Sequence, residues 1–388
     1  MLRTLLLCAP APVKDEPGGY RLDVKFVEGM RAHQAHWGGR INCVLWRTTN
    51  AIPFGRHFDR DELGFDLTVL DENDPVPQEL ISAMDVASIS ADMVDVDDIV
   101  ARANLANVPV VLTLEYTFRI RAKIALLERS ISFPRRLNSI RWQAGHELRV
   151  RKALKGAAGA QFNGYPAFDT YSEKVGRPML YLDNRMKPEL FATPQQMDER
   201  AAYLHAKNPL RLIHSGRLEY MKGAHQLLPV MRELRRLKVD ATLDIFGTGS
   251  LEGEIRAGLA EFGGAVRLYS PVDFETCLVP FSVEQADIFV GTHLQSDPSC
   301  SYVEALGCGL ALAGYKNKMW SRLSAEAGCG KSAPMGNPKA LAAVIAQWDA
   351  NRTDLVNAQR TGLAFARKHD FDTEFARRME HIRLCASL

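Results

Sequence analysis

The sequence predicts an α/β protein made of two doubly wound domains with a cleft between them. Short apolar runs bounded by turn residues alternate with segments of helical periodicity along most of the 388-residue chain. That length suits two domains, each able to bury its own core. Because parallel strands need crossover connections, the alternation favours two parallel sheets covered by helices.

The first half is expected to be an N-terminal domain over residues 1–185. Its opening, MLRTLLLCAP, has an apolar core too short for a signal peptide, and we interpret it as a buried strand. A Pro/Gly-rich loop follows, in which Gly18 and Gly19 let the backbone approach a ligand or form a turn. Residues 20–32 and 97–103 have helical character. The expected strands are residues 3–8, 41–46, 66–70, 87–90, 108–114, 159–163 and 179–182.

Residues 119–155 differ sharply from the rest of this half. They hold eleven lysines and arginines, opposed only by Glu128 and Glu147, with apolar residues and Trp142 interleaved. Such basic helices suit an anionic membrane surface. The alternatives are a solvated helix face with buried aliphatic stems or, least favoured, a nucleic-acid surface. Because the net charge is only +2, no global field attracts nucleic acid, and we expect no such partner.

Cysteine usage and hydropathy indicate the compartment. The seven cysteines are scattered without a C-x-x-C pair, which favours reduced thiols and neither a zinc site nor a disulfide frame. No apolar run approaches the length of a spanning helix. Together with the basic stretch, these features predict a cytoplasmic protein that is peripheral on the inner face of the cell membrane.

The second half alternates strand and helix more clearly, and we expect a domain over residues 186–370. The strands are expected at 210–214, 241–246, 265–269, 286–290 and 310–313. The helices are expected at 223–236, 251–261, 274–284, 301–307, 337–348 and 352–368. A last helix, within residues 371–388, is expected to return to the first domain.

Polar segments follow the strands of the second half, at the edge where open α/β sheets bind ligands. Arg217 and Lys222 place two cations after strand 210–214, which suits a diphosphate, although a solvated loop explains them equally well in isolation. A helix that begins near Ser301 offers unpaired amides to an anion. Glu304 in its first turns could accept hydrogen bonds from a ribose diol or favour the helix dipole.

Four segments in combination, SGRLEYMKG, LDIFGTGSLEGEI, ADIFV and VEALGCGLALAGY, resemble the donor domain of family 4 retaining glycosyltransferases of the GT-B fold, over roughly residues 209–330. The resemblance implies two Rossmann-like domains facing across a cleft, with the C-terminal helix crossing back to the N-terminal domain. It also implies a nucleotide sugar, UDP- or GDP-linked, as co-substrate, with no other cofactor and no metal.

The resemblance also implies roles for individual residues. Arg217 and Lys222 would hold the diphosphate and neutralise the leaving group. Glu304 matches the second Glu of the family's E-x7-E motif. The first Glu would fall at Ser296, where the motif is incomplete, and the neighbouring Asp297 could substitute for it. The residues expected to bind the donor are Gly18, Gly19, Ser215, Gly216, Gly247, Gly249, Tyr269, Ser270, Pro271, Ser296, Asp297, Ser299, Cys300, Ser301 and Glu304.

Glu115 is the third residue expected to act in catalysis. It follows VPVVLTL, at a place where such enzymes often carry a His. It could orient an acceptor hydroxyl or act as a base if burial raises its pKa. Alternatively, it is a structural carboxylate paired with Arg119 or Arg121.

The predicted function is therefore that of a retaining glycosyltransferase. It would move a sugar from a nucleotide-diphosphate sugar to a membrane lipid or lipid-linked glycan, in glycolipid or cell-envelope polysaccharide synthesis. The diphosphate would leave with the help of two cations and helix amides, while the acceptor attacks the same face of the sugar. The alternative is a non-catalytic nucleotide-sugar-binding protein with a decayed site, suggested by Ser296 and by the absent His.

Overall fold

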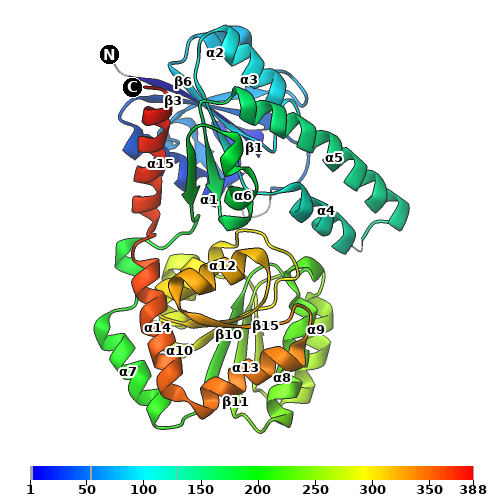
Figure 1. Ribbon diagram of the computed structural model, residues 1–388, viewed down its shortest axis with the longest axis vertical. Coiled ribbons are helices and arrows are strands. Elements are labelled where there is room, and N and C mark those ends of the chain that lie inside the picture. The colour runs from blue at the N-terminus through cyan, green and yellow to red at the C-terminus, as the bar shows by residue number, and fades with distance from the viewer. Residues whose placement is uncertain (1–2, 53–54, 129, 388) are drawn as a thin grey trace. The chain divides into compact units, whose positions relative to one another are not determined.

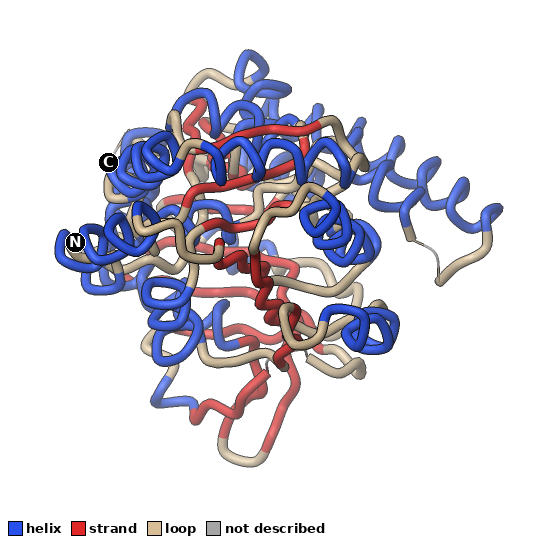
Figure 2. The backbone as a smooth tube through the Cα atoms, turned by 90° about the horizontal axis from the view of Figure 1, so that it is seen from below, coloured by secondary structure: helices blue, strands red, loops and turns tan. Residues whose placement is uncertain are grey.

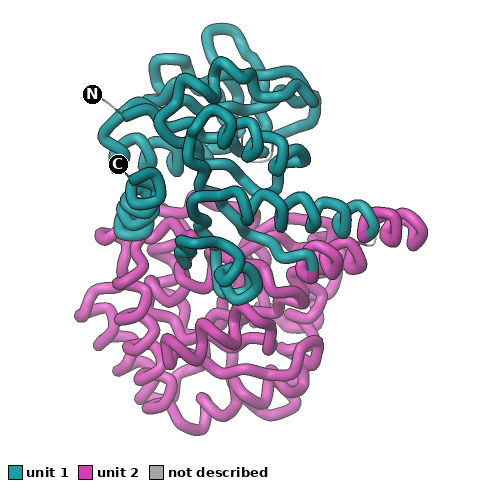
Figure 3. The backbone as a smooth tube through the Cα atoms, turned by 45° about the horizontal axis from the view of Figure 1, so that its top comes forward, with its two compact units in different colours: residues 1–118, 141–181, 372–388 teal, residues 119–140, 182–371 magenta. Residues whose placement is uncertain are grey.

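Two compact units make up the protein (Figure 1, Figure 3). The computed structural model describes residues 3–52, 55–128 and 130–387. The first unit comprises residues 1–118, 141–181 and 372–388, and the second comprises 119–140 and 182–371. Both are α/β units, with strands flanked by helices (Figure 2), which confirms the predicted fold class.

A parallel sheet forms the centre of the first unit, in the order β5-β3-β1-β6-β7-β8-β9. Two further strands extend it by antiparallel pairing, because β2 pairs with the distal part of β1 and β4 pairs with β2. The strands are β1 (Thr4–Glu16), β2 (Gly19–Asp23), β3 (Arg40–Arg47), β4 (Gly55–Asp59), β5 (Asp66–Leu70), β6 (Val86–Ser90), β7 (Val110–Leu114), β8 (Gly159–Asn163) and β9 (Pro178–Tyr181).

The β1–β2 hairpin corrects the predicted loop and the start of the helix at 20–32. Strand β1 continues through Glu16, and β2 occupies residues 19–23 because Leu22 is buried against β4. The helix then begins only after Asp23, whose side chain accepts a hydrogen bond from the Phe26 amide and caps it. The structure explains why a glycine is needed at position 19. A Cβ on Gly19 would lie 2.0 Å from the Phe58 carbonyl oxygen, so it is the β4 backbone that approaches closely.

Helices cover both faces of the first sheet. Helices α1 and α15 share one core cluster, and α3, α6 and the end of α5 share the other. Met379 and Ile382 of α15 are buried with Leu5 and Leu7 of β1, which confirms that the C-terminal helix returns to the first unit. The helices are α1 (Val24–Trp37), α2 (Gln78–Ser82), α3 (Val96–Leu105), α4 (Phe118–Leu127), α5 (Phe133–Gly156), α6 (Tyr165–Tyr171) and α15 (Phe371–Cys385).

The basic stretch forms α4 and α5 and is divided between the units. Residues 119–140 group with the second unit, whereas the sequence places them in the N-terminal domain. On α4, the Lys123 ammonium lies 3.0 Å from the Met335 sulfur of that unit. Helix α5 continues without a break into the first unit, where its first buried side chain is His146.

The second unit has a six-stranded parallel sheet in the order β12-β11-β10-β13-β14-β15. Its strands are β10 (Leu210–Ser215), β11 (Ala241–Phe246), β12 (Val266–Tyr269), β13 (Ile288–Gly291), β14 (Ala311–Tyr315) and β15 (Gly330–Ala333). The strand order reverses between β10 and β13. In a doubly wound sheet this is where ligands bind, at the carboxyl ends of the strands.

The helices of this unit are α7 (Pro194–His205), α8 (Leu227–Arg236), α9 (Glu252–Gly258), α10 (Val279–Gln285), α11 (Cys300–Gly307), α12 (Lys318–Ala327), α13 (Pro338–Ala350) and α14 (Arg352–Ala366). The predicted helix at 223–236 is shorter than expected, because two 3₁₀ turns, Tyr220–Lys222 and Ala224–Gln226, precede α8. Helix α12 and strand β15 were not predicted.

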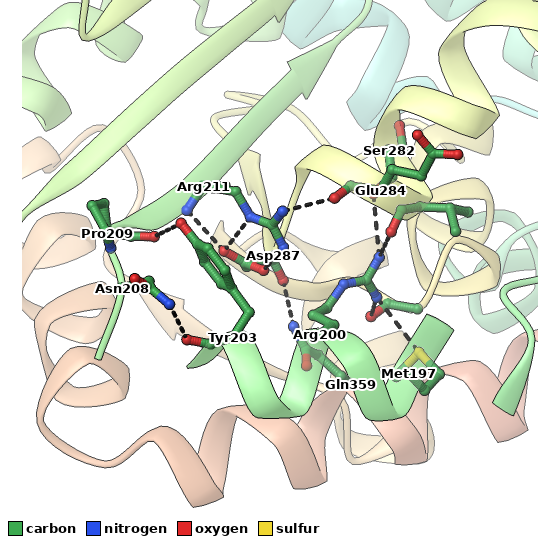
Figure 4. A network of polar contacts seen from close by, with 12 residues as sticks. Met197, Arg200, Tyr203, Asn208, Pro209, Arg211, Ser282, Glu284, Asp287 and Gln359 are labelled. Atoms are coloured by element: carbon green, nitrogen blue, oxygen red, sulfur yellow. Dashed lines mark hydrogen bonds and ion pairs between the residues drawn. The ribbon is translucent and has the colours of Figure 1, made fainter. Parts of the chain in front are cut away.

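Arg200 fixes the position of two helices of the second unit (Figure 4). Its guanidinium is buried and donates to the carbonyls of Ser282 and Val283 in α10 and of Cys308 and Gly309 just after α11. Burial lowers the pKa of Arg200 to about 10, so it stays charged at neutral pH. A cation at two helix C-termini satisfies carbonyls that have no partner within the helix. Arg200 thereby anchors α11 at the end opposite to its N-terminus.

A neighbouring network ties β10 to the same region. Arg211 pairs with the fully buried Asp287, with 2.8 Å between Nη2 of Arg211 and Oδ1 of Asp287 (Figure 4). The side-chain amide of Gln359 donates to the backbone carbonyl of Asp287 at 2.9 Å. Asp287 directly precedes β13, so this pairing holds β10 and β13 in register at their amino ends, opposite to the strand ends where the site lies.

Candidate functional site

The candidate site lies after β10 and β13, where the strand order of the second sheet reverses. Two loops, residues 216–223 and 292–299, leave the sheet there. They are joined by hydrogen bonds from the Thr292 hydroxyl to the Lys222 carbonyl, at 3.0 Å, and from the Leu294 amide to the Met221 carbonyl, at 3.1 Å. Gly223 has a φ of +72°, and a Cβ there would lie 1.9 Å from the Thr292 carbonyl oxygen, so only glycine fits.

Arg217 is the cation of this site that remains available. It is exposed, and within the described part of the chain no hydrogen bond or ion pair holds its guanidinium. The loop that carries it is nevertheless fixed. The Leu218 amide donates to the Thr248 carbonyl at 2.9 Å, and a Cβ on Gly247 would lie 2.0 Å from the Gly216 carbonyl oxygen. The glycines of the GTGS segment thus serve the close approach of two loops, which keeps the base of Arg217 in place.

Lys222 is buried and has a partner. Its ammonium donates to Oδ2 of Asp297, which is also buried. Burial has the largest single effect on Asp297 and would raise its pKa, but the adjacent Lys222 charge and the hydrogen bonds to the carboxylate together outweigh burial and hold that pKa below its usual value. The two predicted cations therefore differ, since Lys222 is already neutralised within the protein whereas Arg217 is not.

Ser296 and Asp297 point to different partners. The Ser296 hydroxyl accepts a hydrogen bond from the Lys318 amide at the start of α12, at 3.0 Å. Asp297 accepts from Lys222, and its own amide donates to the Gln295 side-chain oxygen. The carboxylate beside Lys222 thus comes from Asp297, and the hydroxyl of Ser296 serves the neighbouring helix.

Buried polar side chains that the sequence reasoning missed lie beside this pair. The Tyr302 hydroxyl lies 3.0 Å from Nδ1 of His293 and accepts from the Asn317 amide at 3.3 Å. Gln295 is fully buried, and neither its Nε2 nor Oδ1 of Asp297 has a hydrogen-bond partner among the described residues. The sequence does contain a signal for these residues. The segment THLQSDP directly follows a buried strand, and polar side chains such as these are seldom buried unless they form hydrogen bonds.

Two histidines at the site are held neutral. Nδ1 of His214 lies 2.9 Å from the Val290 carbonyl oxygen, which assigns it the donor tautomer. Burial lowers the pKa of His214 to about 4. Burial and then the Lys222 charge lower the pKa of His293 to about 3. The neutral imidazoles therefore add no charge to this site.

Helix α11 begins at Cys300 and presents its N-terminus at the end of the 292–299 loop. Its preceding residue, Ser299, makes no side-chain capping bond. The Ser301 hydroxyl lies 3.4 Å from the Ser215 carbonyl, which brings the predicted residues of the two strand ends together. Unpaired first-turn amides here favour an anion.

Glu304 is buried within α11 and is already engaged. Arg185 donates from Nε to its Oε1 at 3.0 Å, and the Arg185 guanidinium also lies over the Phe274 ring at 3.9 Å. This pairing was not predicted. It fixes the carboxylate of Glu304 near the 270–274 segment, where a nucleoside was expected.

An aromatic cluster marks the end of β12. Tyr269 stacks on Phe246 with 4.6 Å between ring centroids, and Phe281 meets Phe246 edge to face at 5.0 Å. Beyond the cluster, Ser270 and Pro271 are exposed. Their backbone groups are accessible at the place predicted to face a nucleobase.

Glu115 lies in the first unit, in the loop after β7, and is half-buried. Gly18, in the β1–β2 turn, and Gly19, the first residue of β2, also lie in the first unit. The structure thus brings together the predicted residues of the second unit. The roles of Glu115, Gly18 and Gly19 stay predictions.

Three surveys of the described residues bear on chemistry and location. They contain no group of three or more His, Cys, Asp or Glu side chains that could hold a metal ion. None of the described helices has the length and apolarity needed to cross a membrane. The seven cysteines are free thiols.

Comparison with family models gives a match within the second unit. Residues 195–362 match the family model described as glycosyl transferases group 1. No curated protein sequence matches the chain.

Several solved structures share the fold over their full length. Anabaena HepE in complex with UDP has 14% identity and a TM-score of 0.68, with all of both chains covered. A glycosyltransferase from Rickettsia africae has 11% identity and a TM-score of 0.66, covering 99% of this chain and 98% of that one. WaaG, a glycosyltransferase involved in lipopolysaccharide biosynthesis, has 12% identity and a TM-score of 0.63, covering 97% and 99%. At these identities the likeness establishes the fold, which is the predicted GT-B fold.

Proposed function

We propose that the chain, which has the GT-B fold and matches the glycosyl transferases group 1 model over residues 195–362, is a retaining glycosyltransferase acting on a lipid or lipid-linked acceptor. Its donor would be a nucleotide-diphosphate sugar and its only co-substrate, with no metal ion. The UDP and UDP-glucose complexes of Anabaena HepE support a UDP-linked donor. Synthesis of glycolipids or cell-envelope polysaccharide is the corresponding process.

The unpaired Arg217 at the carboxyl end of β10 carries this proposal. The leaving diphosphate gains negative charge as the glycosidic bond breaks, and a preorganised cation there stabilises that charge. The N-terminus of α11 and the Lys222–Asp297 pair lie at the same strand ends. Because Asp297 already offsets Lys222, Arg217 supplies most of the net positive charge.

Glu115 would serve the acceptor. It follows β7, in the unit expected to bind the acceptor, and could accept a hydrogen bond from the attacking hydroxyl. The hydroxyl would attack the face from which the diphosphate leaves, so the anomeric configuration is kept.

The lipid part of the proposal is supported by the exposed face of α5. Phe133, Leu137 and Leu148 are 61%, 45% and 70% exposed, and helical periodicity places them on one side of the helix. Arg141 and Arg135 are exposed on the same helix. Exposed apolar side chains among cations suit the headgroup region of an anionic leaflet. This supports a peripheral enzyme at the cytoplasmic face.

The test measures transfer of radiolabelled sugar from UDP- and GDP-linked donors into a lipid extract. We expect labelled lipid with retained configuration from one donor class. Flotation with vesicles containing phosphatidylserine or phosphatidylglycerol tests the lipid part. Binding should weaken as salt rises and fall at least tenfold in a Phe133→Ser, Leu137→Ser double variant. Equal binding to neutral vesicles would contradict it.

A second candidate function is nucleotide-sugar binding without transfer. The observation in its favour is Ser296, whose hydroxyl is bound to the α12 backbone and offers the sugar no carboxylate. This candidate predicts donor binding by calorimetry with no turnover on any acceptor.

A further inference from the structure

A buried hydrogen-bond chain in the first unit joins α5 to the loop after β7. The Tyr171 hydroxyl, at the end of α6, donates to Oε2 of Glu147 on α5 at 2.7 Å. The same hydroxyl oxygen accepts from the amide of Phe118 at 3.3 Å. Phe118 ends the loop that carries Glu115 and begins α4. One tyrosine oxygen therefore connects α5 with the backbone of that loop.

Further contacts hold Glu147 and Tyr171 in place. Glu147 and Tyr171 are both buried, and Oε1 of Glu147 accepts from Arg151 at 2.7 Å, one turn further along α5. The Tyr171 ring packs on Phe162 of β8, with 6.5 Å between centroids and 18° between planes. Because a buried carboxylate is costly without partners, Glu147 keeps Tyr171 in one orientation. The Phe118 amide consequently has a defined acceptor.

Exposed residues of α5 lie next to this series of hydrogen bonds. Trp142, 48% exposed, stacks on the buried His146, with 5.5 Å between centroids and 6° between planes. The Arg149 guanidinium lies 5.9 Å from the centroid of the Trp142 ring. His146 directly precedes Glu147, and the exposed Leu148 follows it. The exposed Leu148 is thus adjacent in sequence to the residue that fixes the loop, and Trp142 contacts the residue before it.

We propose that Glu147 and Tyr171 are positioning residues that transmit the seating of α5 on an anionic bilayer to the loop after β7. The inference rests on the proposed function, because it takes that loop as the acceptor side of the site. An ordered α5 fixes Glu147, which fixes the Tyr171 hydroxyl, which holds the Phe118 amide and the adjacent Glu115. The acceptor site would then be ordered where lipid acceptors are present.

Hydrogen exchange with and without phosphatidylglycerol vesicles tests this without an acceptor assay. In the wild-type protein, exchange of a peptide covering residues 115–120 should slow when vesicles bind. Tyr171→Phe removes only the hydroxyl. It should speed exchange at Phe118 about fivefold, the effect of losing one ordinary hydrogen bond. It should also abolish the slowing by vesicles while vesicle affinity stays the same.

Three matched variants separate this role from general loosening. Glu147→Gln keeps an oxygen for Tyr171 and should keep the response to vesicles, whereas Glu147→Leu should lose it. Tyr203→Phe removes a tyrosine hydroxyl bound to the Pro209 carbonyl in the second unit and should leave residues 115–120 unaffected. Each variant is first checked for a wild-type unfolding midpoint.

The outcomes are distinct. If the wild-type protein binds vesicles without slowing at 115–120, or if Tyr171→Phe slows as the wild type does, the inference is wrong while the proposed function stands. If Tyr171→Phe and the wild type give the same KM for a lipid acceptor, the positioning role is also wrong. If no donor is turned over by the wild-type protein, the proposed function itself fails, although the vesicle response can still be measured.

Discussion

Lys222 and Arg217 are five positions apart in the sequence but meet an incoming anion differently. Lys222 is buried and ion-paired with Asp297, whereas Arg217 is exposed with no such partner among the residues described. A diphosphate near Lys222 is repelled by the carboxylate that holds the lysine in place. Asp297 therefore orients Lys222 at some cost in anion affinity.

This division of roles predicts the effect of Asp297→Asn. The amide oxygen still accepts from Lys222, but the negative charge is gone, so UDP should bind roughly threefold to tenfold more tightly at low salt. Calorimetric titration with UDP measures the change. Ser296→Ala, which removes a neighbouring hydroxyl but no charge, is the control. Weaker UDP binding by Asp297→Asn would show that the carboxylate is needed for the loop itself.

The buried histidines predict a pH dependence of stability. The native state holds His214 and His293 neutral, with pKa values of about 4 and about 3, below the usual value near 6.5. The unfolded chain therefore binds more protons below pH 6.5. The stabilisation is fully present above pH 6.5 and is lost as the pH falls towards 4, by up to about 1.4 kcal/mol per pH unit for each histidine.

Denaturant unfolding between pH 7.5 and 4.5 measures this slope, and His293→Gln should reduce it. His57 acts in the opposite direction, since hydrogen bonds to Glu16 and Asp59 raise its pKa, but it is exposed and its effect is screened. A stability that stays flat down to pH 4.5 would contradict the assigned neutral state.

Helix α11 is held at both ends. Ser301 contacts the end of β10 at one end, and Arg200 binds the carbonyls just beyond the other. Arg200→Met should leave several buried carbonyls without a donor and cost about 3 kcal/mol of stability. Arg360→Met, which breaks an exposed ion pair with Asp198, should cost less than about 1 kcal/mol. Similar losses for both variants, measured by urea unfolding, would show that Arg200 does not anchor the helix.

Sequence patterns predicted elements well where burial gives a clear period. Strands β10 and β11 and helices α13 and α14 lie close to the expected ranges. The two strands are short apolar runs, and the apolar residues of the two helices recur at helical spacing. Strand β15, with the sequence GKSA, has no apolar run and was missed. Strand β2 was taken for a helix start because Leu22, Phe26 and Met30 fit a helical period, although Leu22 is buried by strand pairing.

The site could be predicted only in part, because local sequence patterns do not show contacts between residues that are far apart in the sequence. Arg217 and Lys222 stand beside a recognisable strand end, so local sequence places them. The pairing of Arg185 with Glu304 joins residues 119 positions apart, and no local pattern carries it. The same holds for Asn317 and Tyr302, which α12 and α11 bring together.

At the scale of the whole molecule, neither unit is a continuous stretch of chain. The chain passes from one unit to the other after residues 118, 140, 181 and 371. The predicted boundaries near residues 185 and 371 capture two of these passages. The other two follow from α4 and α5, because the chain enters the second unit at the start of α4 and returns to the first unit within α5.

The whole-molecule claim is that the second unit binds the diphosphate of a nucleotide sugar through Arg217 for transfer to an acceptor. The most direct measurement is kcat/KM for sugar transfer by Arg217→Ala beside Arg360→Ala, with UDP affinity measured in parallel. We expect Arg217→Ala to lose about a hundredfold to a thousandfold in kcat/KM, as when one transition-state donor is removed, while Arg360→Ala stays within about twofold of the wild type. Transfer by Arg217→Ala at the wild-type rate would contradict the central claim.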